Sequence, residues 1–206
     1  MIYELLATVS SFIINIISSL GYPGVVILMA LESVCVPIPS EIIMPFSGYL
    51  VFIERFSLWS VIFWGTIGNL IGSIIAYFIG LYGGRPLIEK YGRYLLISRH
   101  DLERAQRWFE KYGAFSIFFS RLLPVVRTFI SLPAGIARMP FGKFSLYTFA
   151  GSLPWSFILT YIGLLTGENW SNIENYFRKF DWLIIILIIS LLGWWLWKKL
   201  LKKQTQ

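Results

Sequence analysis

Charge is scarce in this sequence. Only 14% of its 206 residues are Asp, Glu, Lys or Arg, whereas 56% are hydrophobic and 18% are aromatic. A soluble domain is typically about a quarter charged. The composition therefore excludes a disordered chain, a coiled coil, a collagen-like fibre and a disulfide-rich module. It predicts an all-α integral membrane protein with a single membrane domain over residues 1–206.

Cysteine and histidine each occur once, as Cys35 and His100. A single cysteine can form neither a disulfide framework nor a four-cysteine metal site. No set of His, Asp and Glu has the spacing of metal ligands, so we expect neither a metal nor a cofactor. His100 lies in a charged stretch, whereas a rhomboid-type protease or a histidine phosphatase needs a histidine near its membrane substrate. We therefore expect that the protein is not an enzyme.

Long uncharged runs are what the sequence has instead. A membrane-spanning helix needs about 20 apolar residues, and three segments reach that length: residues 56–84, 144–167 and, with their flanks, 182–197. Residues 24–53 and 113–137 are also apolar, but prolines and charges divide each of them into two short arms. We therefore expect three transmembrane helices and a different structure in the two divided segments.

Each divided segment is predicted to be a re-entrant helical hairpin, which enters the membrane partway and leaves on the same side. The residues expected to break its helices are Pro37, Pro39 and Gly48 in the first segment, and Pro124, Pro133 and Gly135 in the second. Irregular backbone at membrane depth is tolerated only where protein buries it or where it lines a cavity. The alternative is a full transmembrane helix that is kinked at proline.

The distribution of charge predicts the orientation of the chain. Residues 85–112 hold seven bases and four acids, residues 198–203 hold four lysines, and residues 168–181 hold two bases and three acids. The positive-inside rule places the first two segments, and hence the C-terminus, in the cytoplasm, and the third outside. The net charge of +7 is then explained by contact with anionic lipid headgroups, without any nucleic acid.

Two further segments carry recognisable patterns. The apolar residues 5–20 lack the basic start and the cleavage site of a signal peptide, so we expect them to remain in the mature protein. Residues 98–112 place apolar and charged side chains on opposite faces of a helix, which predicts an amphipathic helix in the membrane interface. An ordinary loop helix packed on the domain is the alternative.

The two hairpin segments belong to an internal repeat. Residues 21–84 and 113–167 share an order of features: two short arms with charges, a Phe-Ser-Leu-aromatic segment beginning at Phe56 or Phe144, and an apolar run that ends in glycine. On the predicted orientation, the first hairpin opens outward and the second inward. This is an inverted-topology repeat with two facing hairpins, as in many secondary transporters, where broken helices from the two halves meet near the bilayer midplane.

Four charged residues interrupt the apolar sequence of the hairpins: Glu32 and Glu41 in the first, Arg121 and Arg127 in the second. A charge near the bilayer centre is costly and usually faces a cavity or a partner. Arginine suits phosphate because its guanidinium donates two parallel hydrogen bonds and keeps its charge. We predict that the two arginines bind a phosphate and that the two acids couple protons or pair with the arginines. The alternative is that the four charges only neutralise one another and hold the hairpins in register.

These residues resemble motifs of the bacterial DedA family over about residues 15–170. The segments concerned are Glu32 with Pro37-Ile38-Pro39-Ser40-Glu41, Phe119-Ser120-Arg121-Leu122-Leu123-Pro124-Val125-Val126-Arg127, and Ala134-Gly135-Ile136-Ala137-Arg138-Met139. The resemblance implies an inner-membrane lipid translocase that is linked to proton-motive force, related to the eukaryotic VTT-domain scramblases. It carries the family's functional positions over to Glu32, Glu41, Arg121 and Arg127. Many members have Pro-Gly-Asp where this chain has Pro39-Ser40-Glu41, so the second acid is displaced.

The function that these patterns favour is flippase- or scramblase-like transport of a phosphate-bearing lipid, such as undecaprenyl phosphate or a phospholipid, with possible coupling to protons. One alternative is a proton-coupled antiporter of ions or small solutes. A second alternative is an intramembrane enzyme that acts on lipid phosphates. The lipid, the direction of transport and the oligomeric state have no signal in the sequence.

Overall fold

The computed structural model describes residues 2–36, 38–84, 99–123 and 126–167. Within these ranges every regular element is a helix, so the all-α prediction is confirmed for the described part of the chain. All of these residues belong to one compact unit, Met1–Gly167. The expected transmembrane helix at 182–197 lies outside the described residues, and the organisation of the whole chain as one membrane domain stays a prediction.

The first half of the unit consists of α1 (Ile2–Leu20), α2 (Tyr22–Ser33), α3 (Ser40–Phe52) and α4 (Leu58–Phe78), which continues as the π-helix η1 (Ile79–Gly84). Gly21 separates α1 from α2 with φ at 67°, a conformation that glycine adopts without strain. The break between α2 and α3 contains Cys35, which also has positive φ, and α3 begins directly after Pro39. Residues 24–53 thus lie in two short helices with a break between them, and their arrangement as a re-entrant hairpin stays a prediction.

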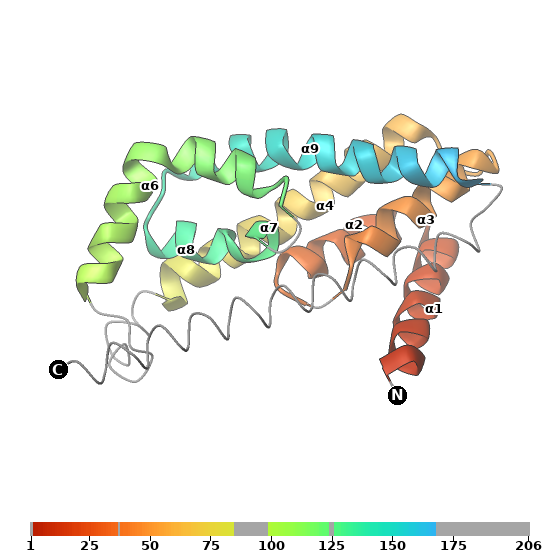
Figure 1. The fold of residues 1–206 in the computed structure, drawn as a ribbon, viewed down its shortest axis with the longest axis horizontal. Helices are drawn as coiled ribbons and strands as arrows, with labels where there is room; N and C mark the ends of the chain where they lie inside the picture. Colours follow the sequence, from red (N-terminus) through yellow and green to blue (C-terminus); the bar gives the residue numbers. More distant parts are fainter. Residues whose placement is uncertain (1, 37, 85–98, 124–125, 168–206) are drawn as a thin grey trace, which may run out of the picture. The chain divides into compact units, whose positions relative to one another are not determined.

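The second half consists of α6 (Arg99–Ser120), α7 (Val126–Phe129), α8 (Ser131–Ile136) and α9 (Phe141–Leu165). Figure 1 shows that α6 bends along its length. This helix contains both the amphipathic segment expected at 98–112 and the first arm expected for the second hairpin. The boundary expected between them, near Tyr112, is therefore wrong. Gly113 alone does not end a helix, since it costs only about 1 kcal/mol there. The placement of residues 98–112 in the membrane interface stays a prediction.

Three residues expected to break helices lie inside them. Gly48 is within α3, and Pro133 and Gly135 are within α8. Pro133 is tolerated because it lies in the first turn of α8, where backbone N–H groups have no partner within the helix. Pro39 does precede a helix start as expected. Pro37 and Pro124 lie outside the described residues.

The short helices of each half pack on the long helix of the other half. Helix α3 packs on α9, α8 packs on α4 and η1, and α4 and α9 pack on each other. Within each half, α2 packs on α4 and α6 packs on α9. Helices α2 and α7 also contact each other. Figure 1 shows the four short helices in the order α8, α7, α2 and α3, so that α2 and α7 lie in the middle. The ends of the two pairs of short helices are therefore brought together inside the unit.

The glycines explain why these helices approach so closely. A Cβ at Gly48 would overlap the carbonyl oxygen of Thr160 and lie 3.0 Å from the Cα of Gly163. A Cβ at Gly135 would likewise overlap the carbonyl oxygen of Tyr77, three residues before Gly80. The contact of α3 with α9 thus resembles the contact of α8 with the α4–η1 helix. In both, a glycine of the short helix meets a carbonyl oxygen that lies three residues before a glycine of the long helix.

Two helices of the described residues are long and apolar enough to cross a membrane, Leu58–Gly84 and Phe141–Leu165. They correspond to the transmembrane helices expected at 56–84 and 144–167. Trp59 on α4 and Leu146 on α9 are among the most exposed large apolar side chains. Such side chains are suited to contact lipid, because the hydrocarbon core solvates apolar groups.

Candidate functional site

Glu32 and Arg127 form a buried ion pair between the two halves of the unit. Glu32 lies in the last turn of α2 and Arg127 on α7, and the two residues are 4% and 2% exposed. A nitrogen of the guanidinium, Nη2, contacts the Glu32 oxygen Oε1. A carboxylate at the C-terminal end of a helix is disfavoured by the helix dipole, so Glu32 depends on the arginine for compensation.

Ser40 connects this pair with the second acid. It is the first residue of α3, and its hydroxyl lies 3.2 Å from Glu32 Oε1 and 3.3 Å from Glu41 Oε2. The guanidinium of Arg127 also contacts the Ser40 hydroxyl. Glu41 Oε1 lies 3.8 Å from Arg127 Nη2, and the Glu41 side chain is 18% exposed. The first turn of α3 suits a carboxylate because the helix N-terminus is partly positive.

The indole of Trp155 covers Arg127 from the side of α9. The central carbon of the guanidinium lies 4.8 Å from the centre of the indole ring. An arginine over the face of a tryptophan is stabilised by the electrons of the ring, more strongly where water is excluded. Arg127 is therefore held by α2, α3 and α9 together.

Arg121 occupies a neighbouring buried position but does not face the acids. It follows the end of α6 and donates hydrogen bonds to the backbone carbonyl of Arg127 at 2.8 Å and to the hydroxyl of Ser131 at 2.8 Å. Its other acceptors are Asn69 and Thr148, each at 3.4 Å. Arg121 thus ties the backbone around α7 and α8 to α4 and α9.

The expectation that both arginines meet both acids therefore holds in the structure only for Arg127. The structure brings Glu32, Glu41 and Arg127 together, whereas Arg121 is connected to them through the backbone of Arg127. The physical reason is that Arg121 finds hydrogen-bond acceptors on neighbouring helices. Oxygens from three different elements accept hydrogen bonds from its terminal nitrogens Nη1 and Nη2, so these nitrogens are paired without a carboxylate.

Several polar residues of this region are not predicted as site residues from the sequence. They are Ser40, Asn69, Ser131, Thr148, Ser152 and Trp155. One signal does exist in the sequence: Thr148, Ser152, Ser156 and Thr160 recur every four residues on α9, and all four are buried. Asn69 of α4 accepts a hydrogen bond from Ser152 at 2.8 Å, so this polar stripe faces α4. Such a stripe in an apolar run indicates a face turned toward protein.

Metal binding finds no support in this region. In residues 2–36, 38–84, 99–123 and 126–167, no three side chains of His, Cys, Asp or Glu lie close enough to hold an ion. What the arrangement offers is a buried guanidinium, two carboxylates and a bridging hydroxyl. These groups can hold an anion at Arg127 or exchange a proton at the acids.

Comparison with known proteins identifies relatives over almost the whole chain. The model of the VTT domain matches residues 38–165. Undecaprenyl phosphate transporter A of Bacillus subtilis is 40% identical over 95% of each chain. The protein of the same name from Staphylococcus aureus is 32% identical over 86% of this chain and 89% of its own. Protein DedA of Escherichia coli is 31% identical over 49% of this chain and 46% of its own.

No solved structure matches the chain. The family assignment therefore rests on sequence, and the described part of the chain is consistent with it: its regular elements are all helices, and two of them are suited to cross a membrane. The matched residues 38–165 include Glu41, Arg121 and Arg127 but begin just after Glu32. The chain belongs to the VTT-domain (DedA) family of bacterial membrane proteins.

Proposed function

We propose that the protein moves a phosphate-bearing lipid between the two leaflets of the bacterial cytoplasmic membrane and that Arg127 binds the phosphate. The observation that carries the proposal is the burial of Arg127 where helices of both halves meet, beside two carboxylates. The relatives named undecaprenyl phosphate transporter A support a lipid phosphate as the substrate. Undecaprenyl phosphate and phospholipids both carry the required group.

The four charged residues then have different roles in transport. Arg127 is the phosphate ligand, because its guanidinium lies at the meeting point of α2, α3 and α9. Arg121 keeps the backbone of Arg127 and the hydroxyl of Ser131 in place, which is a smaller role than the direct phosphate binding expected from the sequence. Glu32 and Glu41 neutralise Arg127 while no lipid is bound, and one of them takes up a proton when a phosphate adds its negative charge beside them.

This proposal predicts that Arg127→Lys slows lipid transport at least tenfold in liposomes that contain the purified protein. Lysine keeps the positive charge but lacks the planar fork, and a lost hydrogen bond to a charged group weakens binding by about 1.5–3 kcal/mol. The measurement is the transfer of undecaprenyl phosphate or phosphatidylglycerol between leaflets. Arg138→Lys is the matched control, because Arg138 is exposed. Equal transport by Arg127→Lys and the wild-type protein would contradict the proposal.

The same liposomes separate lipid transport from the alternatives. If a lipid is the cargo, coupled proton movement requires undecaprenyl phosphate or phospholipid that the protein can carry. An antiporter of ions or small solutes would move protons without such a lipid and with its own solute. An enzyme acting on lipid phosphates would release inorganic phosphate, which a chemical assay of the same sample detects.

The paired contacts support an inverted-topology repeat with two re-entrant hairpins, α2–α3 and α7–α8 with the end of α6. Each hairpin packs on the long helix of the other half, and Gly48 and Gly135 make equivalent contacts there. Two halves of opposite orientation make such exchanged contacts when they are related by a two-fold axis in the membrane plane. We infer that the tips of the hairpins meet near the bilayer midplane, at Arg127.

The proposed orientation places residues 99–111 and the C-terminal lysines in the cytoplasm and residues 168–179 outside. We expect Lys111→Cys and Gln204→Cys to be labelled from the cytoplasmic side and Asn172→Cys from the outside. The measurement is labelling of intact and opened cells with a membrane-impermeant thiol reagent, in a Cys35→Ser background. Labelling of Lys111→Cys from the outside would contradict the orientation.

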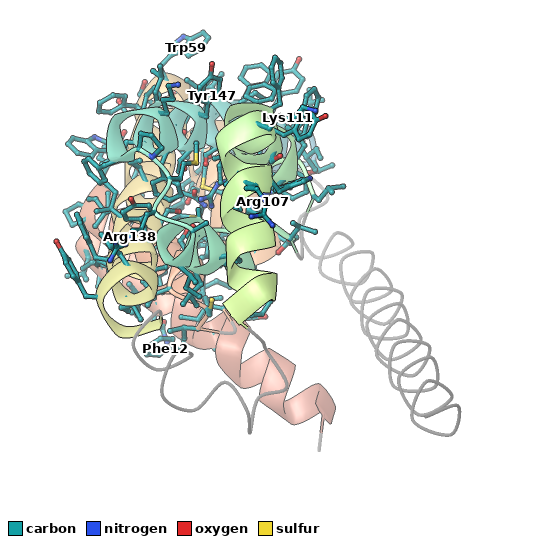
Figure 2. All side chains as sticks on the ribbon, turned by 90° about the vertical axis from the view of Figure 1, so that its left-hand side faces the viewer. Phe12, Trp59, Arg107, Lys111, Arg138 and Tyr147 are labelled. Atoms are coloured by element: carbon teal, nitrogen blue, oxygen red, sulfur yellow. The ribbon has the colours of Figure 1, made fainter. Side chains whose placement is uncertain are left out.

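The same orientation accounts for the basic end of the unit. Arg107 and Lys111 on α6 are exposed, as are Arg138 and Lys143 beside the start of α9. Figure 2 looks onto this end and shows Arg107 and Lys111 on one side and Arg138 on the other. Exposed basic side chains at the cytoplasmic surface attract anionic lipid headgroups, each by about 1 kcal/mol. We propose that this end rests on the headgroups of the inner leaflet.

A further inference from the structure

Unpartnered polar atoms are concentrated at Arg127. Six buried side-chain nitrogen or oxygen atoms of the described residues have no hydrogen-bond partner, and three of them are Glu32 Oε2, Arg127 Nε and Trp155 Nε1. Buried polar atoms are nearly always paired, because leaving one unpaired costs its full desolvation. Three such atoms on residues that contact one another indicate that this spot is built for a further polar group.

The contacts of Arg127 are unevenly distributed over its guanidinium. Oxygens of Glu32, Ser40 and Glu41 all lie at Nη2. None of the described residues accepts the proton of the Nε–H group. An arginine can donate five hydrogen bonds, so a phosphate oxygen can accept the proton of Nε–H while Glu32 remains at Nη2.

Trp155, whose ring contacts the guanidinium, supplies a second donor. Its ring centre lies 4.8 Å from the guanidinium carbon, and its indole N–H has no acceptor within the described residues. An indole N–H can only donate, and so can Nε–H of arginine. Two adjacent buried donors without an acceptor are complementary to an anion that carries several oxygens.

We propose that the indole N–H of Trp155 and the Nε–H of Arg127 together donate hydrogen bonds to the lipid phosphate. Trp155 is then a substrate-binding residue as well as a cover for the guanidinium. This inference rests on the proposed function, since it names a second ligand for the same phosphate. It also fits the position of Trp155 on α9, because α9 contacts α3 and α4 and so connects the site with both halves.

The substitution Trp155→Phe isolates the N–H group. Phenylalanine keeps an aromatic ring for the guanidinium but has no donor, so a residue that only packs tolerates this change. Trp59→Phe is the matched control, because Trp59 is 70% exposed on α4. The first readout is the rise in thermal midpoint of the detergent-solubilised protein when undecaprenyl phosphate is added, with undecaprenol as the phosphate-free reference. The second is the KM and kcat of lipid transport in liposomes.

We expect Trp155→Phe to raise the KM for undecaprenyl phosphate about tenfold and to need about tenfold more lipid for the same thermal shift, with kcat little changed. Trp59→Phe and the undecaprenol samples should match the wild-type protein. An unchanged KM and thermal shift in Trp155→Phe would overturn the assignment of Trp155 and leave the proposed function intact. Binding without transport by the wild-type protein would refute the proposed function alone, whereas no binding at all would refute both.

Discussion

Replacing Arg127 by Gln is expected to lower the free energy of unfolding by about 3–5 kcal/mol, because it leaves Glu32 buried without its partner. The double variant Glu32→Gln/Arg127→Gln should recover most of this loss, since two neutral amides can hydrogen bond to each other and to Ser40. Transport should be lost in both variants, because neither has a cation for the phosphate. The measurements are denaturation in detergent micelles and lipid transfer in liposomes.

This pair of variants separates stability from function at one site. Arg138→Gln, which removes an exposed arginine away from the buried acids, is the control and should change both quantities much less than Arg127→Gln does. A double variant as unstable as Arg127→Gln would show that the ion pair is not what Arg127 contributes to folding. Lipid transport by a stable double variant would remove Arg127 from the proposed mechanism.

The second large effect concerns the contacts between helix backbones. Gly163→Ala is expected to cost about 1–3 kcal/mol or more, because its methyl group would overlap the backbone of Pro45 in α3. A flexible side chain could move aside, but two packed helices must separate. Gly135→Ala should cost a similar amount, since its methyl group would overlap the backbone of Tyr77 in the same way.

Gly142→Ala is the matched control, because it lies on α9 like Gly163 and a Cβ there meets nothing within 4 Å. Alanine is the better helix former, so this control should be neutral or up to about 1 kcal/mol more stable. The thermal midpoints of the three variants in one detergent provide the comparison. A mild effect at Gly135 beside a severe one at Gly163 would contradict the equivalence of the two contacts.

The sequence predicts the break between the two helices of the first hairpin because local signals define it. Pro39 and the residues before it end one helix and start the next, and charges as rare as Glu32 and Arg127 are conspicuous in apolar sequence. These signals depend only on backbone chemistry and on the cost of burying charge, so they can be recognised without knowledge of the tertiary structure.

The pairing of the charges and the role of the glycines could not be predicted in the same way. Whether Arg121 turns to the acids or to Asn69 depends on where α4 and α9 lie beside the end of α6. A glycine such as Gly48 is equally consistent with a helix break and with close packing, because both need a residue without a side chain. Only the neighbouring helix distinguishes these two roles.

The exchange of partners between the halves also affects biosynthesis. Helix α3 ends at Phe52, but α9, on which it packs, begins at Phe141. At about 5–20 residues per second, a ribosome needs on the order of ten seconds to make the roughly ninety residues between them. During this interval α3 can pack on α1, α2 and α4 but lacks its main partner α9, and the carboxylate of Glu32 lacks Arg127. We therefore expect the first hairpin of the nascent chain to contact the insertion machinery or lipid headgroups until the second half has been made.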